Sequence, residues 1–237
     1  MRPPAAHRVP TRAHFTQTID AHYKTMRKLP VYLLLDTSGS MQGEPIESVR
    51  TGMQTLVATL RQDPHALESA YLSVITFAEK AAQLLPLTEL GQFQMPELAA
   101  SGTTSMGAAL VLLAERVQVE VAKTTAQQKG DWKPIVFLMT DGESTDDLAD
   151  GIAAIKRGGF GTFVACAAGA KANVAQLQRI TESVVRLDTT DANAIRAFFK
   201  WVSASIATTS QKVDLTKKDL AGLADLPPPP PEVTLAT

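Results

Sequence analysis

The sequence predicts a doubly wound α/β fold, in which a mostly parallel sheet carries helices on both faces and one antiparallel strand at an edge. Three observations support this prediction. Apolar runs of strand length alternate with longer amphipathic stretches from Leu29 to about Ala207. The runs are continuously apolar rather than alternating, which is typical of strands covered by helices on both faces. Two of the runs are separated by only three residues, which favours a hairpin.

The elements follow one another in a regular order. The first strand, 31–35, is uninterrupted in its apolar character. Residues 45–62 form a helix, because apolar side chains recur at helical spacing and Pro45 suits the first turn. Strands 71–77 and 81–85 then pair through Ala78-Glu79-Lys80. The same two patterns predict further helices at 106–121, 146–156, 172–181 and 191–207, and further strands at 134–139, 160–167 and 184–187.

We predict a single folded domain between two tails of different composition. Residues 1–28 form a flexible basic arm, with five arginines and lysines from Arg8 onward against the single acid Asp20. Residues 29–208 form the domain. Residues 209–237 form a charged and proline-rich tail that does not add to the core, and Pro227–Pro231 are expected to serve as a polyproline spacer or as a docking peptide for a partner.

Composition argues against several classes of function. A formal net charge of −1 gives no general attraction to nucleic acid or to an anionic membrane. No stretch reaches the roughly 18 to 20 apolar residues that cross a bilayer, and no signal-peptide core is visible, so we expect a soluble, cytoplasmic protein. Cys166, the only cysteine, lies in an apolar run and is expected to be buried and unreactive.

Three loops rich in oxygen ligands are expected at the carboxyl ends of the strands, where open α/β sheets bind ligands. They are Asp36-Thr37-Ser38-Gly39-Ser40, Gly102–Gly107 and Thr140–Glu143. Each loop alone could be an ordinary turn or helix cap. A set of two carboxylates and three hydroxyls drawn from these loops is all oxygen, which suits a hard cation such as Mg²⁺, Mn²⁺ or Ca²⁺ and disfavours zinc. Five protein oxygens leave an octahedral ion open to another ligand, which predicts a recognition site.

The three motifs Asp-x-Ser-x-Ser, Gly-x-Thr-x-x-Gly and Thr-Asp-Gly resemble the von Willebrand factor A (VWA) domain and its metal-ion-dependent adhesion site. The resemblance spans about Leu29 to Ala207 and implies a Rossmann-like sheet. It also implies a divalent cation, most simply Mg²⁺, bound through five residues: Asp36, Ser38, Ser40, Thr104 and Asp141. Thr104 fits the family pattern because it lies three residues before Gly107, with Thr103 as the alternative. A partner's carboxylate, or a phosphorylated side chain, would then complete the coordination.

Two longer segments, 27–41 and 133–142, are similar to the bacterial TerY-type branch of this family, which is linked to tellurium resistance. That resemblance implies partnership with a co-encoded Ser/Thr protein kinase and a PP2C-type phosphatase, with this chain as scaffold or substrate. Residues 1–25 and the proline-rich tail depart from the branch's pattern. A kinase would reach hydroxyls in or beside the tail, at Thr208, Thr209, Ser210, Thr216, Thr234 and Thr237.

Two other functions compete with this interpretation. One is an adaptor subunit of an ATPase machine of the metal-chelatase kind. The other is a phosphatase resembling haloacid dehalogenases, which also place a strand-end aspartate on Mg²⁺. Those phosphatases need a second aspartate two residues later, and this chain has Ser38 there. We therefore expect a binding module rather than an enzyme.

Overall fold

A computed structural model describes residues 27–216, 219 and 222–236, and its centre is a seven-stranded sheet. The strand order is β3-β2-β1-β4-β5-β6-β7. The strands are β1 Leu29–Asp36, β2 Ala70–Phe77, β3 Ala81–Glu89, β4 Ile135–Thr140, β5 Thr162–Ala168, β6 Ser183–Leu187 and β7 Thr234–Leu235. Strands β2, β1, β4, β5 and β6 run parallel, whereas β3 and β7 are antiparallel to their neighbours. The predicted doubly wound fold and the antiparallel β3 edge are confirmed.

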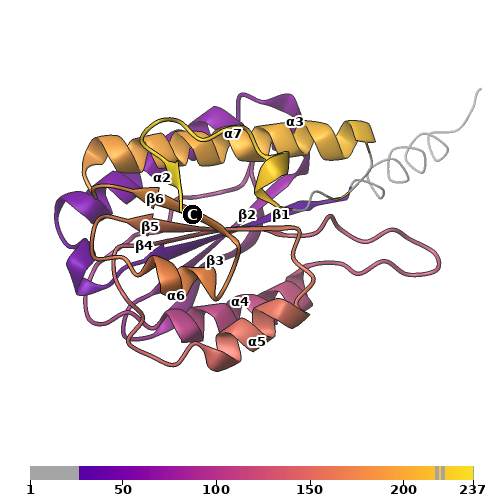
Figure 1. Ribbon diagram of the computed structural model, residues 1–237. Helices are drawn as coiled ribbons and strands as arrows, with labels where there is room; N and C mark the ends of the chain where they lie inside the picture. Colours follow the sequence, from indigo (N-terminus) through magenta and orange to yellow (C-terminus); the bar gives the residue numbers. More distant parts are fainter. Residues whose placement is uncertain (1–26, 217–218, 220–221, 237) are drawn as a thin grey trace, which may run out of the picture.

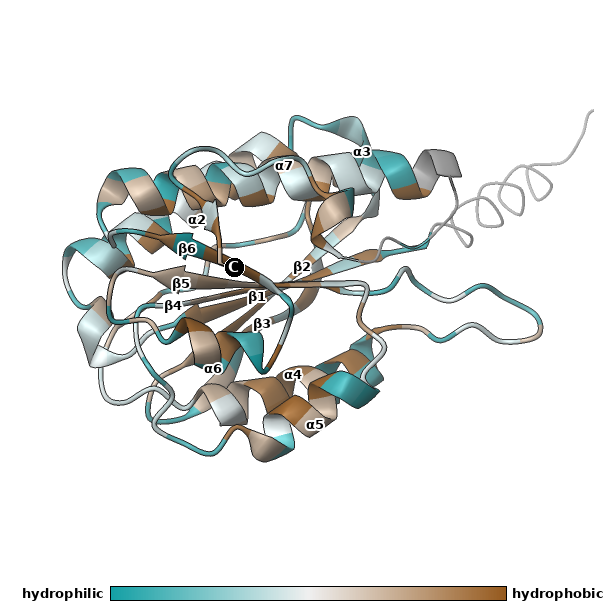
Figure 2. Ribbon diagram, viewed as in Figure 1, coloured by the Kyte–Doolittle hydropathy of each residue, from teal (hydrophilic) through white to brown (hydrophobic). Residues whose placement is uncertain are grey.

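Helices cover both faces of the sheet (Figure 1). One layer contains α2 Glu44–Leu60, α3 Pro64–Ser69 and α7 Ala192–Thr216, and the other contains α4 Met106–Glu120, α5 Ala149–Arg157 and α6 Val174–Gln178. The strands are the most uniformly apolar segments, and the outward faces of the helices are more hydrophilic (Figure 2). Among the described residues, no helix is long and apolar enough to span a membrane.

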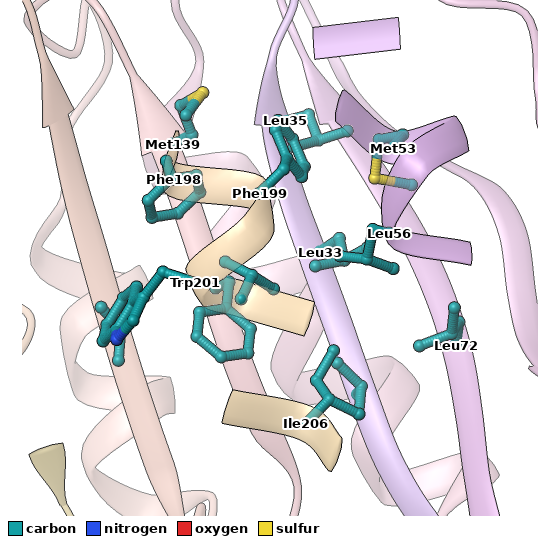
Figure 3. Packing of buried hydrophobic residues seen from close by; sticks show 14 of the residues in the cluster. Leu33, Leu35, Met53, Leu56, Leu72, Met139, Phe198, Phe199, Trp201 and Ile206 are labelled. Carbon is teal, nitrogen blue, oxygen red and sulfur yellow. The ribbon is translucent and has the colours of Figure 1, made fainter. Parts of the chain in front are cut away.

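Alternate residues of β1 serve two separate cores. Leu33 and Leu35 face α2 and α7, whereas Tyr32 and Leu34 face the layer of α4 and α5. On the first face, side chains of α7 such as Phe198, Phe199 and Trp201 pack toward the sheet (Figure 3). Because every residue of β1 is buried, the continuous apolar run of the sequence is explained by burial on both faces.

Helices α2 and α7 approach each other closely at Gly52. A methyl group at this position would lie 2.3 Å from the Phe199 ring, so the contact requires a residue without a side chain. On the other face, a Cβ at Gly151 of α5 would meet the Gly107 carbonyl of α4 at 2.9 Å. Glycines therefore set the helix spacing in both layers.

Four helices differ from the sequence prediction. Helix α3 was not predicted, and α6 is shorter than the expected 172–181. Helix α5 begins at Ala149 rather than at residue 146, because Asp146 caps α4 instead. Helix α7 continues to Thr216 rather than ending near residue 207. The hydroxyl residues near the middle of α7 are typical of a polar tail in sequence. In the structure they are buried, and Ser203, Thr209 and Ser210 each donate to the carbonyl four residues earlier. The boundary at 208 thus falls inside a helix.

The expectation that the tail adds nothing to the core is wrong. Leu226 and Val233 are buried, and the Trp201 indole N–H donates to the Pro227 carbonyl at 2.8 Å. After the proline run, β7 pairs with β6 and closes that edge of the sheet. The prolines therefore lie against the protein's own α7. A strand of two exposed residues carries no periodic signal, so the sequence could not reveal it.

The structure describes only part of the predicted N-terminal arm and part of the tail that carries the predicted phosphorylation sites. Residues 1–26 of the arm, and Thr237, lie outside the described residues. Arg27, by contrast, belongs to the domain, because its guanidinium stacks on Trp132 at 3.3 Å from the ring centroid. Thr209 and Ser210 are fully buried in α7, so the expectation that a kinase reaches them is wrong, whereas Thr234 is exposed.

Candidate metal site

The candidate site lies where the chain reverses its direction across the sheet. From β1 the chain moves outward to β2 and β3, and it then returns to β4 on the other side of β1. The carboxyl ends of β1 and β4, at Asp36 and Thr140, therefore lie side by side with their connections leading away in opposite directions. This topological switch point leaves a crevice in which open α/β sheets bind ligands.

The loop after β1 is held tightly by backbone hydrogen bonds. Thr37 N–H donates to the Phe77 carbonyl at 2.9 Å, and Ser38 N–H donates to Asp36 Oδ1 at 2.8 Å. The chain then forms a 3-10 turn, Gly39–Met41. Gly39 N–H donates to the Gly102 carbonyl at 2.9 Å, and a Cβ on Gly39 would lie only 3.3 Å from that oxygen. Gly39 therefore lets the first and second loops touch.

A chain of hydrogen bonds joins the first loop to the third. The Ser40 hydroxyl donates to Asp141 Oδ1 at 2.7 Å, and the Ser38 and Ser40 hydroxyl oxygens are 3.1 Å apart. The Ser40 hydroxyl therefore links Asp141 to Ser38, the neighbour of the Asp36 carboxylate. Three of the five predicted ligands are thus in direct contact, although a hundred residues separate Ser40 from Asp141.

Asp36 is anchored by a residue that the sequence interpretation did not use. The Thr140 hydroxyl donates to Asp36 Oδ2 at 2.5 Å, and this contact fixes the carboxylate between β1 and β4. Thr140 was visible as the first residue of Thr-Asp-Gly. Its role could not be found in the sequence, because it depends on the pairing of β1 with β4.

The electrostatic environment of Asp36 disfavours an uncompensated charge. Desolvation by burial raises the pKa of this carboxyl above its usual range, and hydrogen bonds from Ser38 and Thr140 oppose the shift. The neighbouring charge of Asp141 raises the pKa further. Two carboxylates that repel each other in a buried crevice favour a cation between them.

Thr104 lies in the second loop, whose backbone is bound to the third. Its N–H donates to the Thr145 hydroxyl at 3.2 Å, and its carbonyl accepts from Thr145 N–H at 2.9 Å. The Thr104 hydroxyl oxygen lies 3.9 Å from the point where a Cβ on Gly142 would be. Thr104 is buried beside the Asp141 loop, whereas Thr103 is exposed.

Asp146 holds the end of the second loop through backbone N–H groups in the first turn of α4. This role was not recognised in the sequence. The two carboxylate oxygens of Asp146 accept from Gly107 N–H at 2.8 Å and Ala108 N–H at 2.9 Å, at the start of α4. A Cβ on Gly107 would meet the Asp147 carbonyl at 2.2 Å. The glycine of Gly-x-Thr-x-x-Gly is therefore needed so that the segment between β4 and α5, which contains Asp146 and Asp147, can pack on α4.

The donor set fits a hard divalent cation. It combines two carboxylates with three hydroxyls, and the only thiol and imidazole among the described residues, Cys166 on β5 and His65 on α3, lie outside these loops. Accordingly, the described residues contain no group of three His, Cys, Asp or Glu side chains that could hold a metal. The hydroxyls must supply the remaining ligands.

Together, the fold and the donor set define a doubly wound α/β domain with an all-oxygen crevice at its switch point. The chain belongs to the von Willebrand factor type A domain family, whose model matches residues 31–200. No curated protein gives a match to the sequence.

Solved structures of low sequence identity share the fold. Proximal thread matrix protein 1 (PTMP1) from the mussel byssus, in a form with a zinc-occupied MIDAS motif, matches with a TM-score of 0.56 at 19% identity, over 77% of this chain and 48% of that one. A von Willebrand factor type A protein from Catenulispora acidiphila matches with a TM-score of 0.54 at 21% identity, over 77% and 43%. The PilB minor pilin from Streptococcus sanguinis matches with a TM-score of 0.58 at 14% identity, over 78% and 62%. This chain thus spans less than two thirds of each.

Proposed function

We propose that this VWA domain is a metal-dependent protein-binding module. Asp36, Ser38, Ser40, Thr104 and Asp141 would hold a divalent cation, and an acidic group of a partner protein would complete its coordination. The observation that carries the proposal is the hydrogen bond from Ser40 to Asp141, which brings hydroxyl and carboxylate ligands of two loops together at the switch point. The zinc-occupied MIDAS motif of PTMP1 supports a divalent cation in this fold.

Magnesium is the cation that we propose, with Mn²⁺ or Ca²⁺ as alternatives. A set of carboxylate and hydroxyl oxygens without nitrogen or sulfur matches the ligand preference of hard ions. The zinc in PTMP1 makes zinc a necessary comparison. The cation would neutralise the adjacent carboxylates and offer a position to an incoming carboxylate or phosphate group.

We propose a binding role rather than a catalytic one. Two residues after Asp36 stands Ser38, whose hydroxyl is engaged with Ser40. A hydroxyl there cannot act as the general acid and base that a phosphatase of the haloacid-dehalogenase kind requires at that position. Phosphatase activity in a metal-loaded sample that disappears with Asp36→Ala would contradict this proposal.

The proposed setting is a bacterial stress system of the tellurite-resistance type. The similarity of residues 27–41 and 133–142 to the TerY-type branch supports a co-encoded Ser/Thr kinase and a PP2C-type phosphatase as partners. The alternative is an adaptor subunit of an ATPase complex. The genes that neighbour this one would separate the two, since each setting requires its own enzyme to be encoded nearby.

The experiment that tests the binding role is an affinity pulldown in Mg²⁺ and in EDTA. We expect a partner to be retained only with Mg²⁺ and only by the wild type, because Asp36→Ala removes a carboxylate from the site. Thr37→Val is the matched control, since Thr37 lies in the same loop but its hydroxyl bonds the Phe77 carbonyl. A partner retained equally in EDTA would contradict the mechanism.

A further inference from the structure

A second cavity lies at the opposite end of the sheet from the metal site. It has a volume of about 550 Å³, within the range of small-molecule sites. Its walls come from the ends of α4 and α5, from residues that lead into β4, and from Arg27 just before β1. The six residues of β4 separate it from Asp141 by roughly 17 to 20 Å, so the two sites share no ligand.

Four cationic side chains line this cavity, namely Arg27, Lys123, Lys133 and Arg157. None of them forms an ion pair with a described residue. The two lining carboxylates are engaged by backbone groups instead. Asp131 accepts from the N–H groups of Lys28 at 3.0 Å and Ala122 at 2.9 Å, and Asp219 accepts from Lys133 N–H at 3.0 Å.

Arg27 is fixed in place at the cavity wall. Its guanidinium lies 3.3 Å from the centroid of the Trp132 ring. Nε donates to the Gly130 carbonyl at 2.6 Å and Nη2 donates to the Asp131 carbonyl at 3.2 Å. No described residue accepts from Nη1. A donor held rigid before binding loses little conformational entropy when a ligand arrives.

The balance of charge favours an anion even after the helix ends are counted. The four cationic side chains are opposed by the two carboxylates of Asp131 and Asp219. The carboxyl ends of α4 and α5 each add about half a negative charge, so about one unit of positive charge remains in the lining. The metal end, in contrast, presents Asp36, Asp141 and Asp146.

We propose that this cavity, which we call the basic cavity, binds a small anion with several negative charges. Charge-assisted hydrogen bonds from Arg157, Lys133 and Nη1 of Arg27 would hold the ligand. The volume exceeds what a single phosphate group fills, so a phosphate ester or a polycarboxylate of metabolite size is the class of ligand that fits. The inference is independent of the metal site.

The test is calorimetric titration of the full chain with pyrophosphate and, separately, with citrate. EDTA is present throughout, so that neither probe can bind through a metal at Asp36 and Asp141. We expect one molecule to bind per chain, and the tighter of the two probes identifies phosphate or carboxylate as the preferred chemistry. The double variant Lys133→Gln/Arg157→Gln should bind at least about tenfold more weakly, as expected when charge-assisted hydrogen bonds are lost.

Lys156→Gln is the matched control, because Lys156 neighbours Arg157 on α5 but does not line the basic cavity. Its affinity should equal that of the wild type. All three substituted side chains are exposed, so the fold should be retained, and circular dichroism would verify this. Failure of both probes to bind at millimolar concentration, or an equal loss of affinity in Lys156→Gln, would overturn the proposal.

Discussion

The Ser40 hydroxyl donates a 2.7 Å hydrogen bond to the Asp141 carboxylate, and this contact joins the loops that follow β1 and β4. The same contact holds the Asp141 carboxylate in place. Ser40 would therefore have two roles, as a ligand of the cation and as the residue that positions another ligand, Asp141. The contact makes Ser40 the most informative of the hydroxyls to remove.

Ser40→Ala should weaken cation binding without unfolding the domain, because Ser40 is exposed and makes no core contact. A saturating cation stabilises a folded protein by about 2.7 kcal/mol at a hundred times its dissociation constant. We expect Mg²⁺ to raise the Tm of the wild type and to raise that of Ser40→Ala much less. Thermal unfolding with and without Mg²⁺ measures the difference, and an unchanged shift would exclude Ser40 as a ligand.

Asp36→Asn should stabilise the metal-free protein at neutral pH. Burial raises the pKa of Asp36 in the folded state, so the folded protein holds this proton more tightly than the unfolded chain does. Wild-type stability therefore falls as pH rises from the unfolded pKa through the folded one. The asparagine has no such dependence.

Urea unfolding in EDTA across that pH range is the measurement for Asp36→Asn. The advantage of the variant should be small in acid and should grow toward neutral pH. In Mg²⁺ the order should reverse, because only the wild type gains from the cation. A variant that is less stable than the wild type in EDTA at neutral pH would contradict this view of Asp36.

Gly107→Ala should destabilise the domain by roughly 1 to 3 kcal/mol, the usual cost of overpacking. The added methyl group would meet the Asp147 carbonyl at 2.2 Å, so the segment that leads into α5 must move away from α4. Gly91→Ala is a suitable control, since its nearest neighbour, Glu89 Oε1, is 3.7 Å away. Equal unfolding free energies for the two variants would show that this close approach is not needed.

The tail should contribute to stability through its buried side chains. Val233 is 2% exposed and Leu235 is 52% exposed, although both lie in the same short segment. Val233→Ala should therefore cost about 1 to 2 kcal/mol, through lost burial and the cavity that remains. Leu235→Ala should change stability little. If chemical denaturation shows equal effects, the tail does not pack on the domain in solution.

Cys166 should be inert in the folded protein. It is fully buried, and desolvation raises the pKa of its thiol far above the usual value, so the thiolate that reacts with disulfide reagents is almost absent. Ellman's reagent should label it only in denaturant. Fast labelling under native conditions would reveal an opening of β5 that the structure does not show.

The sequence predicted the central elements well because their signals are local. The apolar run of β1 and the helical spacing of α2 depend on neighbouring residues alone, and both appear within a few residues of the expected limits. The loops after β1 and β4 were also recognisable, because the carboxyl ends of these two strands lie side by side at the switch point. The second loop does not follow a strand directly, since β3 ends at Glu89, and it was recognisable from its motif at the start of α4. The structure places Asp36, Ser38, Ser40, Thr104 and Asp141 in those loops.

What could not be predicted depends on contacts between distant residues. Thr140 supports Asp36 only because β1 and β4 are neighbours, and Asp146 caps α4 from a loop thirty-nine residues away. The buried hydroxyls of α7 and the short β7 resemble an exposed tail in sequence, because the burial of those hydroxyls and the pairing of β7 with β6 both depend on contacts with the rest of the domain. Polar residues that bond internally are hard to distinguish from solvated ones by pattern alone.

The most direct test of the proposed metal site is calorimetric titration of the full chain with Mg²⁺, Mn²⁺, Ca²⁺ and Zn²⁺, in parallel with Asp141→Ala. Asp141 is chosen because it contacts Ser40 and contributes to the shifted pKa of Asp36. We predict that the wild type binds one Mg²⁺ per chain and that Asp141→Ala binds none. Absence of binding by the wild type at millimolar Mg²⁺, or undiminished binding by Asp141→Ala, would contradict it.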